Sequence, residues 1–309
     1  MRRRTYRNIL IVAILAILIA VGIAGISIYQ KYRSQPVSNA SQDAASGVIA
    51  DGLPADSYFE ISFFDVGEGD STLVCCDGQT MLVDGGSPES SSFLYTYLKY
   101  HGIDYLDYIV CTHAHEDHVG GLAGALNYAK VGTAYAPVKE FDTRAFRSLA
   151  KYLGEQGKQI TVPQAGDSFR LGNASVMIVG PVDMTLAEEN VNNSSIVLHI
   201  EYGNTSFLIT GDAEVLEEQS ILEAGYDIRS DVLRIGHHGS YTSTSRDFLE
   251  AVSPEYCVIS VGLDNLYGHP HDEVLNRIEA FGATIYRTDH DGDIVCTSDG
   301  KNVTFRTEK

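Results

Sequence analysis

The hydrophobic pattern begins with one long apolar run close to the start of the chain. Residues 9–28 read ILIVAILAILIAVGIAGISI and contain no charged side chain. At about 1.5 Å rise per residue, a helix of this length matches the ~30 Å hydrocarbon core of a bilayer. The alternatives are a buried helix or a cleaved signal peptide, whose apolar region is usually shorter and followed by a small-x-small site. No such site follows here, so the pattern predicts an uncleaved transmembrane anchor.

The flanks of this run predict its orientation. Residues 1–8 contain four Arg and no acidic residue, whereas only Lys31 and Arg33 follow the run closely. The positive-inside bias then makes 1–8 a cytoplasmic basic tail and places the bulk of the chain outside the cell, as a single-pass protein of the cell membrane. Residues 29–57, rich in Ser, Ala, Asp and Gly with little periodicity, are predicted to be an extracytoplasmic linker.

From residue 58 onward, short apolar runs alternate with amphipathic ones. Predicted strands include STLVCC, TMLVD, LDYIVCT, TSFLITGD and DVLRIG, and predicted helices include SSFLYTYLKY, EVLEEQSILEAG and HDEVLNRIEAF. Such alternation is typical of a layered α/β architecture, and the uninterrupted apolar strands indicate sheets that are covered on both faces. The sequence therefore predicts one α/β domain over residues 58–309.

Composition and charge narrow the class of protein. An apolar fraction of 44% supports a sizeable core and excludes a disordered chain. The formal charge is −19, but after residue 33 the chain holds 16 basic and 41 acidic residues, a formal −25. This acidic domain cannot coat nucleic acid through a basic face. Any anionic substrate would have to be attracted by bound metal ions.

The segment most suited to metal chemistry is Thr112-His-Ala-His-Glu-Asp-His118, which follows a predicted strand and precedes a predicted helix. Imidazole and carboxylate groups bind zinc and similar divalent ions at about 2.0–2.2 Å. In an extended stretch, residues two apart point the same way, so His113 and His115 are predicted to bind one ion. The turn into the helix would bring Asp117 and His118 towards a second ion.

This H-x-H-x-D-H segment resembles the hallmark of the metallo-β-lactamase superfamily. Roughly residues 58–306 also resemble the extracytoplasmic domain of the ComEC family of DNA-uptake competence proteins. The segments that carry this likeness are FFDVGEGDSTLV, MLVDGG, NNSSIVLHIEYGNTSFLITGDAE, DVLRIGHHGS and VISVGLDNLYGHPHDEVLNRIEAFGATIYRTD. The resemblance implies a four-layer αββα sandwich, preceded by the transmembrane helix, with one or two divalent ions (Zn or Mn) at one edge.

The resemblance also implies a ligand set. His113 and His115 would bind the first ion, Asp117, His118 and His237 the second, and Asp212 would bridge the two. We favour His237 over His238 as the ligand and expect His238 to lie behind it or to contact substrate. The alternative for Asp212 is a helix N-cap. Asp84, in MLVDGG, would orient a ligating imidazole, with a turn-forming Asp-Gly as the alternative.

One departure from the superfamily concerns a further His in a Gly-His-Thr turn. The corresponding stretch, residues 190–195, reads NVNNSS and contains no His. The amide oxygen of Asn192 or Asn193 is the candidate replacement, a change that favours Mn²⁺ or a single ion over two zinc ions. The nearest imidazole, His199, lies in mid-strand and is expected on an exposed face.

The remaining candidates lie in loops. We expect His269 to reach the metal face and hold an anionic oxygen or donate a proton, so the candidate catalytic residues are Asp117, His238 and His269. Asp65, like Asp70 in the same segment, is either a substrate contact or a turn residue, and Ser240 is a possible hydrogen-bond donor to phosphate. The segment 289–293, DHDGD, is expected to form a hairpin turn.

Together these features predict a membrane-anchored, extracytoplasmic metal-dependent hydrolase, most simply a phosphodiesterase or nuclease-like enzyme. The alternatives are a hydrolase of cell-surface polymers, such as teichoic acid or phosphorylcholine esters, and a non-catalytic metal-binding module that binds DNA or wall polymer. The expected partners are an anionic substrate and, through the N-terminal helix, the membrane. The sequence indicates no protein partner.

Overall fold

The computed structural model describes residues 53–54 and 57–309. The predicted tail, the anchor over 9–28 and most of the linker lie outside the described residues. Within the described part of the chain, no helix is both long and apolar enough to cross a membrane.

The first of two sheets has eight strands in the order β15-β14-β1-β2-β3-β4-β5-β6. Strands β3 to β6 pair in parallel, whereas β15, β14, β1, β2 and β3 pair antiparallel. The strand bounds are β1 Phe59–Phe63, β2 Thr72–Cys76, β3 Gln79–Val83, β4 Tyr105–Val110, β5 Lys130–Tyr135, β6 Ile160–Thr161, β14 Ile294–Ser298 and β15 Val303–Thr307.

The second sheet has seven strands in the order β13-β12-β11-β10-β9-β8-β7. Here β10 to β13 pair in parallel, and β7 to β10 pair antiparallel. The strand bounds are β7 Ser168–Leu171, β8 Ala174–Gly180, β9 Val197–Tyr202, β10 Thr205–Ile209, β11 Val232–Arg234, β12 Tyr256–Ile259 and β13 Thr284–Arg287. The carboxyl ends of parallel strands meet at one edge of a sheet, and this edge carries the candidate site in both halves of the molecule.

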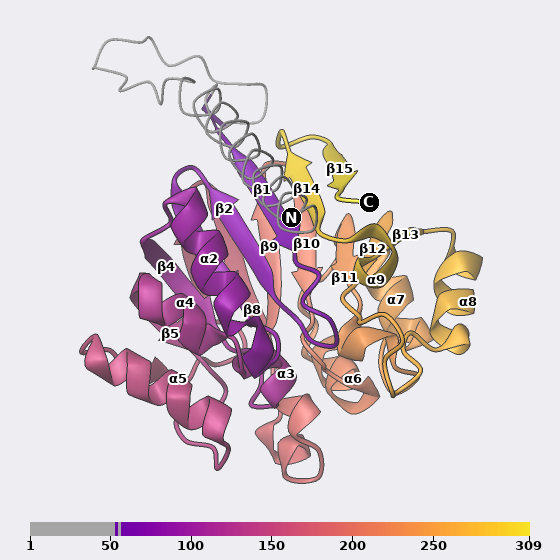
Figure 1. The fold of residues 1–309 in the computed structure, drawn as a ribbon. Coiled ribbons are helices and arrows are strands. Elements are labelled where there is room, and N and C mark those ends of the chain that lie inside the picture. Colours follow the sequence, from indigo (N-terminus) through magenta and orange to yellow (C-terminus); the bar gives the residue numbers. More distant parts are fainter. Residues whose placement is uncertain (1–52, 55–56) are drawn as a thin grey trace, which may run out of the picture. The chain divides into compact units, whose positions relative to one another are not determined.

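Helices cover the outer face of each sheet, so the α/β prediction is confirmed (Figure 1). On the first sheet lie α2 (Ser91–His101), α3 (Glu116–Val119), α4 (Leu122–Tyr128) and α5 (Arg144–Glu155). On the second lie α6 (Val215–Ala224), α7 (Arg246–Val252) and α8 (Asp272–Phe281). The shorter helices are η1 Pro88–Ser90, η2 Met184–Glu188, η3 Val191–Ser194, η4 Gly236–Gly239 and α9 Thr288–Asp291.

Three apolar clusters hold these four layers together. One fills the space between the two sheets, with Phe59 and Phe207 stacked at 4.8 Å between ring centroids. The other two lie between each sheet and its helices. Burying each large apolar side chain contributes about 1.5–3 kcal/mol, so the layered core is the main source of stability.

Two sequence-based predictions, one boundary and one turn, need correction. Leu53, which we placed in the linker, is buried and belongs to the cluster between the sheets. The segment around Asp289 is a helical turn, α9, because β13 and β14 belong to different sheets and a hairpin cannot join them. Asp289 pairs there with the Arg287 guanidinium at 2.7 Å. The helix α5 and the strand β5 did not figure among our predictions.

A buried carboxyl in α6 gives the fold a testable pH dependence. Glu217 is fully buried, with one oxygen accepting the Val182 N–H at 2.7 Å, and burial raises its pKa to about 7. Because the folded-state pKa lies above the unfolded one, stability is lost as pH rises from about 4.5 to about 7. We expect Glu217→Gln to abolish this loss. Between pH 5 and pH 8, the free energy of unfolding should then fall by on the order of 2 kcal/mol more in the wild-type protein than in the variant.

Urea denaturation at pH 5 and pH 8 measures this difference. Glu223→Gln, an exposed position on the same helix, is the matched control and should leave the pH dependence of the wild-type protein in place. An identical pH dependence in wild type and Glu217→Gln would contradict the assignment.

Candidate metal centre

The H-x-H-x-D-H segment lies at the carboxyl end of β4. His113 lies in the loop after the strand, His115 precedes α3, and Asp117 and His118 lie in the first turn of α3. The Nε2 atom of His113 and the Nδ1 atom of His115 lie 3.1 Å apart. His118 is fully buried, whereas about a third of the Asp117 side chain is exposed. The loop-to-helix turn therefore brings all four side chains to one place.

A buried carboxylate fixes this segment from behind. Asp84, just after β3, accepts the Thr112 backbone N–H at 2.7 Å and the Thr112 hydroxyl at 2.6 Å. Its Oδ2 atom also lies 2.8 Å from Nδ1 of His118. With Nδ1 occupied in this way, the Nε2 atom of His118 is left to face the centre.

The second half of the molecule contributes Asp212, which follows β10 and is fully buried. Its Oδ2 atom lies 3.3 Å from Nε2 of His118, 3.6 Å from Nε2 of His238 and 3.8 Å from Nε2 of His113. Its backbone N–H donates to the Ser195 hydroxyl at 3.0 Å. The N-cap of α6 is Glu214, so the alternative of Asp212 as a helix N-cap is wrong. One carboxylate oxygen thus faces both halves of the H-x-H-x-D-H segment.

The two consecutive histidines after β11 point to different parts of the site. His238 donates from Nδ1 to the Ser260 carbonyl at 2.9 Å, and its Nε2 atom lies 3.4 Å from Oδ2 of Asp117. His237 instead turns Nδ1 towards Glu214 Oε1 at 3.2 Å. Both residues have a left-handed backbone, with φ of 47° and 52°, which turns the two side chains in directions that extended residues would not give.

The positions of these donor atoms fit bound divalent ions. Two ligands at about 2.0–2.2 Å from one tetrahedral ion lie about 3.3–3.6 Å apart. The donor pairs given above span 3.1–3.8 Å. Four residues offer atoms that all lie within 4.8 Å of one another: Asp117, His118, Asp212 and His238. Buried atoms there, including Nε2 of His118 and of His238, make no hydrogen bond of acceptable geometry with another described residue.

The pKa shifts of the candidate ligands show how strongly the carboxylates and imidazoles at the centre interact. Burial alone would raise the pKa of Asp212, but the imidazoles of His118 and His238 outweigh it and hold that pKa well below its usual range. Burial would lower the pKa of His118, but Asp212, Asp84 and Asp117 raise it well above its usual value. Burial and neighbouring His118 lower the pKa of His113. An ion bound here would have to displace the His118 proton, so we expect metal binding to weaken in acid.

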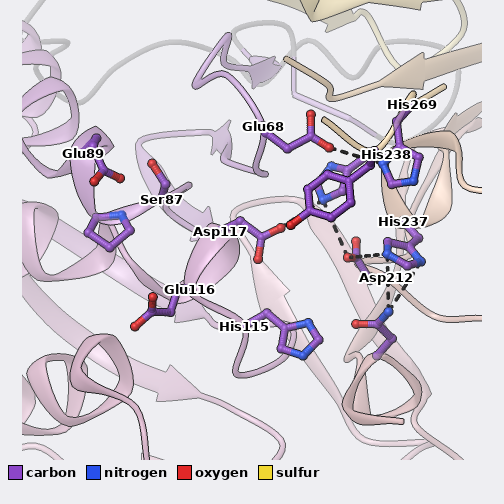
Figure 2. Close-up of a pocket in the computed structure, with 13 residues that line it drawn as sticks. Glu68, Ser87, Glu89, His115, Glu116, Asp117, Asp212, His237, His238 and His269 are labelled. Carbon is purple, nitrogen blue, oxygen red and sulfur yellow. Dashed lines mark hydrogen bonds and ion pairs between the residues drawn. The ribbon is translucent and has the colours of Figure 1, made fainter. Parts of the chain in front are cut away.

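The centre opens into a cleft of about 630 Å³ (Figure 2). His269 lies on its far wall, with Nδ1 3.2 Å from Glu68 Oε1, and its ring centroid is 6.1 Å from that of His238. In the described part of the chain, no Lys or Arg lines the cleft. Five acidic residues line it: Glu68, Glu89, Glu116, Asp117 and Asp212. Charge complementarity to an anion therefore depends on bound ions.

The two candidate asparagines have separate positions in η3. Asn192 lines the cleft, and its amide nitrogen donates to Glu214 Oε1 at 3.1 Å. Asn193 accepts the Glu214 backbone N–H at 3.2 Å and does not line the cleft. Only Asn192 therefore faces the space where the expected imidazole is missing.

The structure also gives the positions of three other residues that the sequence singled out. Asp65 lies outside the cleft lining; its carboxylate accepts the Gly67 N–H and pairs with Lys309 at 3.2 Å, so it is a turn residue. Ser240 is buried and accepts the Thr242 N–H within its own loop. His199 is buried, not exposed, with Nε2 3.1 Å from the Arg229 carbonyl.

Sequence reasoning missed three residues. Arg234, fully buried at the end of β11, lies 2.6 Å from Asp70 Oδ2 and 3.7 Å from Asp212 Oδ1. Asp70 is therefore an internal ion-pair partner, not a turn or substrate residue. Glu214 and Glu68 each support an imidazole of the cleft. The signal for Arg234 was a charge inside the apolar run DVLRIG, directly before the two histidines.

The fold and the site define an αββα protein of the metal-dependent hydrolase type, with candidate metal ligands where strand ends converge. The chain belongs to the Metallo-beta-lactamase superfamily, which residues 64–262 match. It shares 31% identity over 253 residues with "ComE operon protein 3" of Bacillus subtilis (strain 168), covering 76% of this chain and 32% of that protein. The prediction of superfamily and competence-type relatives is confirmed.

A second relative is "Competence protein ComA" of Neisseria gonorrhoeae, 32% identical over 75% of this chain and 31% of that protein. This chain spans about a third of the length of these curated relatives. Among solved structures, CmlA, a diiron β-hydroxylase from Streptomyces venezuelae, matches with a TM-score of 0.50 at 15% identity, over 83% of this chain and 55% of that one. That likeness concerns the fold.

Proposed function

We propose that this protein is a two-ion phosphodiester hydrolase. The observation that carries the proposal is the single Asp212 oxygen that lies within 3.8 Å of imidazoles on both sides of the centre. His113 and His115 would hold one ion, Asp117, His118 and His238 would hold the other, and the Asp212 carboxylate would be shared by both. Two adjacent divalent ions activate water near neutral pH and stabilise the attacking and leaving oxygens of a phosphodiester.

The protein's own groups hold this arrangement and handle protons. Asp84 and the Ser260 carbonyl fix the tautomers of His118 and His238, which leaves each Nε2 atom free to bind an ion. Glu68 holds His269 by Nδ1, and its second oxygen accepts the Gly262 N–H at 3.0 Å. His269 thereby presents Nε2 to the cleft, and with both ring nitrogens protonated it would donate the Nε2 proton to the leaving oxygen and keep its Nδ1 proton directed at Glu68.

Nucleic acid is the first candidate substrate, because one similar protein is named "Competence protein ComA" and the sequence resembles the DNA-uptake competence family. We further propose that residues 9–28 anchor the chain in the cell membrane and that the hydrolase domain lies outside the cell. An anchored enzyme of this kind acts on polymers at the cell surface.

A second candidate, esters of cell-surface polymers such as phosphorylcholine, is favoured by the charge of the cleft. Five carboxylates line it, and Tyr267 contributes an aromatic ring that is 70% exposed. Carboxylates and aromatic faces attract organic cations and repel a polyanion away from the ions. A diester with one negative charge and a cationic group suits this lining better than a long nucleic acid.

Turnover of bis-p-nitrophenyl phosphate with added Mn²⁺ or Zn²⁺ tests the proposed function. His115→Ala should abolish this turnover, whereas Asp227→Asn, an exposed position that pairs only with nearby Arg229, should not change it. A panel of single-stranded DNA, RNA, a phosphorylcholine ester and a chromogenic cephalosporin then ranks the substrate classes. Hydrolysis of the cephalosporin alone, or no turnover with either ion, would refute the proposal.

A further inference from the structure

The two halves of the metal centre are unequally supplied with ligands. Asp117, His118, Asp212 and His238 offer four donor atoms within 4.8 Å of one another. On the other side, His113 and His115 offer two imidazole nitrogens 3.1 Å apart, and Asp212 Oδ2 lies 3.8 Å from the first of them. Zinc and related ions require at least four ligands, which water completes in catalytic sites that have three protein ligands. Counting Asp212 for both ions, the first site thus has three protein donors where the second has four.

His237 is the imidazole that remains. It lines the cleft, its side chain is 23% exposed, and its Nε2 atom lies 3.9 Å from Oδ2 of Asp212. That distance is close to the 3.8 Å between His113 and the same oxygen. His237 is absent from the four-residue group around Asp117, which already offers four donor atoms to the second ion.

Glu214 holds His237 in the form that a ligand requires. Its Oε1 atom lies 3.2 Å from Nδ1 of His237 and accepts from the Thr242 hydroxyl at 3.0 Å and the Asn192 amide at 3.1 Å. A carboxylate at Nδ1 keeps the proton there and leaves the Nε2 lone pair free, as in the carboxylate–histidine–metal arrangement. His238 has the equivalent support from the Ser260 carbonyl.

Asn192 is the competing donor, since its Oδ1 atom is buried and makes no hydrogen bond within the described residues. Its amide nitrogen, however, is committed to Glu214 and lies 3.4 Å from both ring nitrogens of His237. A neutral amide oxygen is also a weaker ligand than imidazole for zinc-like ions. These contacts make Asn192 a positioning residue for Glu214 and His237.

We propose that the consecutive histidines divide between the two ions, with His237 completing the first site and His238 the second. The left-handed backbone at both positions is what sends neighbouring side chains to different ions. This assignment supplies the imidazole that the stretch 190–195 lacks from a neighbouring element, η4, whose His237 lies 3.4 Å from the Asn192 amide. It rests on the proposed two-ion site but not on the identity of the substrate.

Metal content after dialysis, measured by inductively coupled plasma mass spectrometry with Mn²⁺ and with Zn²⁺, tests the assignment. The wild-type chain should hold two ions, and His237→Ala and His113→Ala should each hold one. The double variant His113→Ala/His237→Ala should still hold one ion, because both changes affect the same site. His237→Ala/His238→Ala should hold none.

Several results would overturn the assignment. These are a wild-type chain with a single ion, two ions in His237→Ala, or none in His113→Ala/His237→Ala. Circular dichroism of each variant verifies folding, and His237 is a tolerant position because it is partly exposed. Two ions in the wild-type chain without phosphodiester turnover would refute the proposed function and leave the ligand assignment intact.

Discussion

Asp212→Asn is expected to remove both ions and to lower phosphodiester turnover by about 10³-fold. The asparagine keeps the size of the side chain but loses the negative charge that faces His113, His118 and His238 through one oxygen. Affinity for each ion should fall by more than about 100-fold, since even residues behind the ligands cost 10–100-fold. Metal analysis after dialysis and kcat/KM for bis-p-nitrophenyl phosphate measure the two effects.

Asp117→Asn is the matched comparison for Asp212→Asn. Asp117 contacts His118 and His238 but not the His113–His115 pair, so its replacement should remove one ion and leave the other. Equal loss in the two variants would argue against a bridging role for Asp212. Retention of two tightly bound ions in Asp212→Asn would exclude that role.

Arg234→Met is expected to cause the largest loss of stability, about 3–5 kcal/mol in the free energy of unfolding. The guanidinium is fully buried, lies 2.6 Å from Asp70 and donates to the Gly211 carbonyl. Methionine has a similar volume but leaves the Asp70 carboxylate buried without its counter-charge. Urea denaturation in the presence of EDTA measures the effect without a contribution from bound metal.

Two further variants test the cause of this effect. Arg246→Met removes an exposed arginine that also pairs with a carboxylate, at 2.7 Å, and should cost less than about 1 kcal/mol. Asp70→Asn/Arg234→Met should cost less than the sum of its single variants, because the unpaired charge is removed. Additive losses would show that Arg234 acts through packing alone.

The sequence was most informative where one local segment determines the geometry. The candidate ligands from His113 to His118 lie close together because one strand end and one helical turn suffice to place them. Contacts with distant parts of the chain are not needed for this. The same holds for the α2 helix, which ends at Gly102 in the left-handed conformation. The alternation of strands and helices was sufficient to predict the covered sheets.

Residues whose partners are distant in sequence were not predictable in this way. The roles of His237 and His238 depend on two left-handed backbone positions, which carry no sequence signature in non-glycine residues. In the sequence, Arg234 is a single charge inside an apolar strand of the second sheet. Its partner Asp70 precedes β2 of the first sheet, and only the fold brings the two together. Asp65 and Asp70 lie in the same sequence segment and could not be told apart there. The fold makes Asp65 a turn residue and Asp70 the buried partner of Arg234.

The origin of the ligands has a consequence for folding. His113, His115, Asp117 and His118 follow β4 of the first sheet, whereas Asp212 and His238 follow β10 and β11 of the second. An ion bound by both sets fastens the two sheets at their common edge, and its binding free energy adds to that of folding. At a free-metal concentration 100 times Kd this contribution is about 2.7 kcal/mol. We therefore expect metal supply to govern how readily the domain opens to proteases, independently of any reaction.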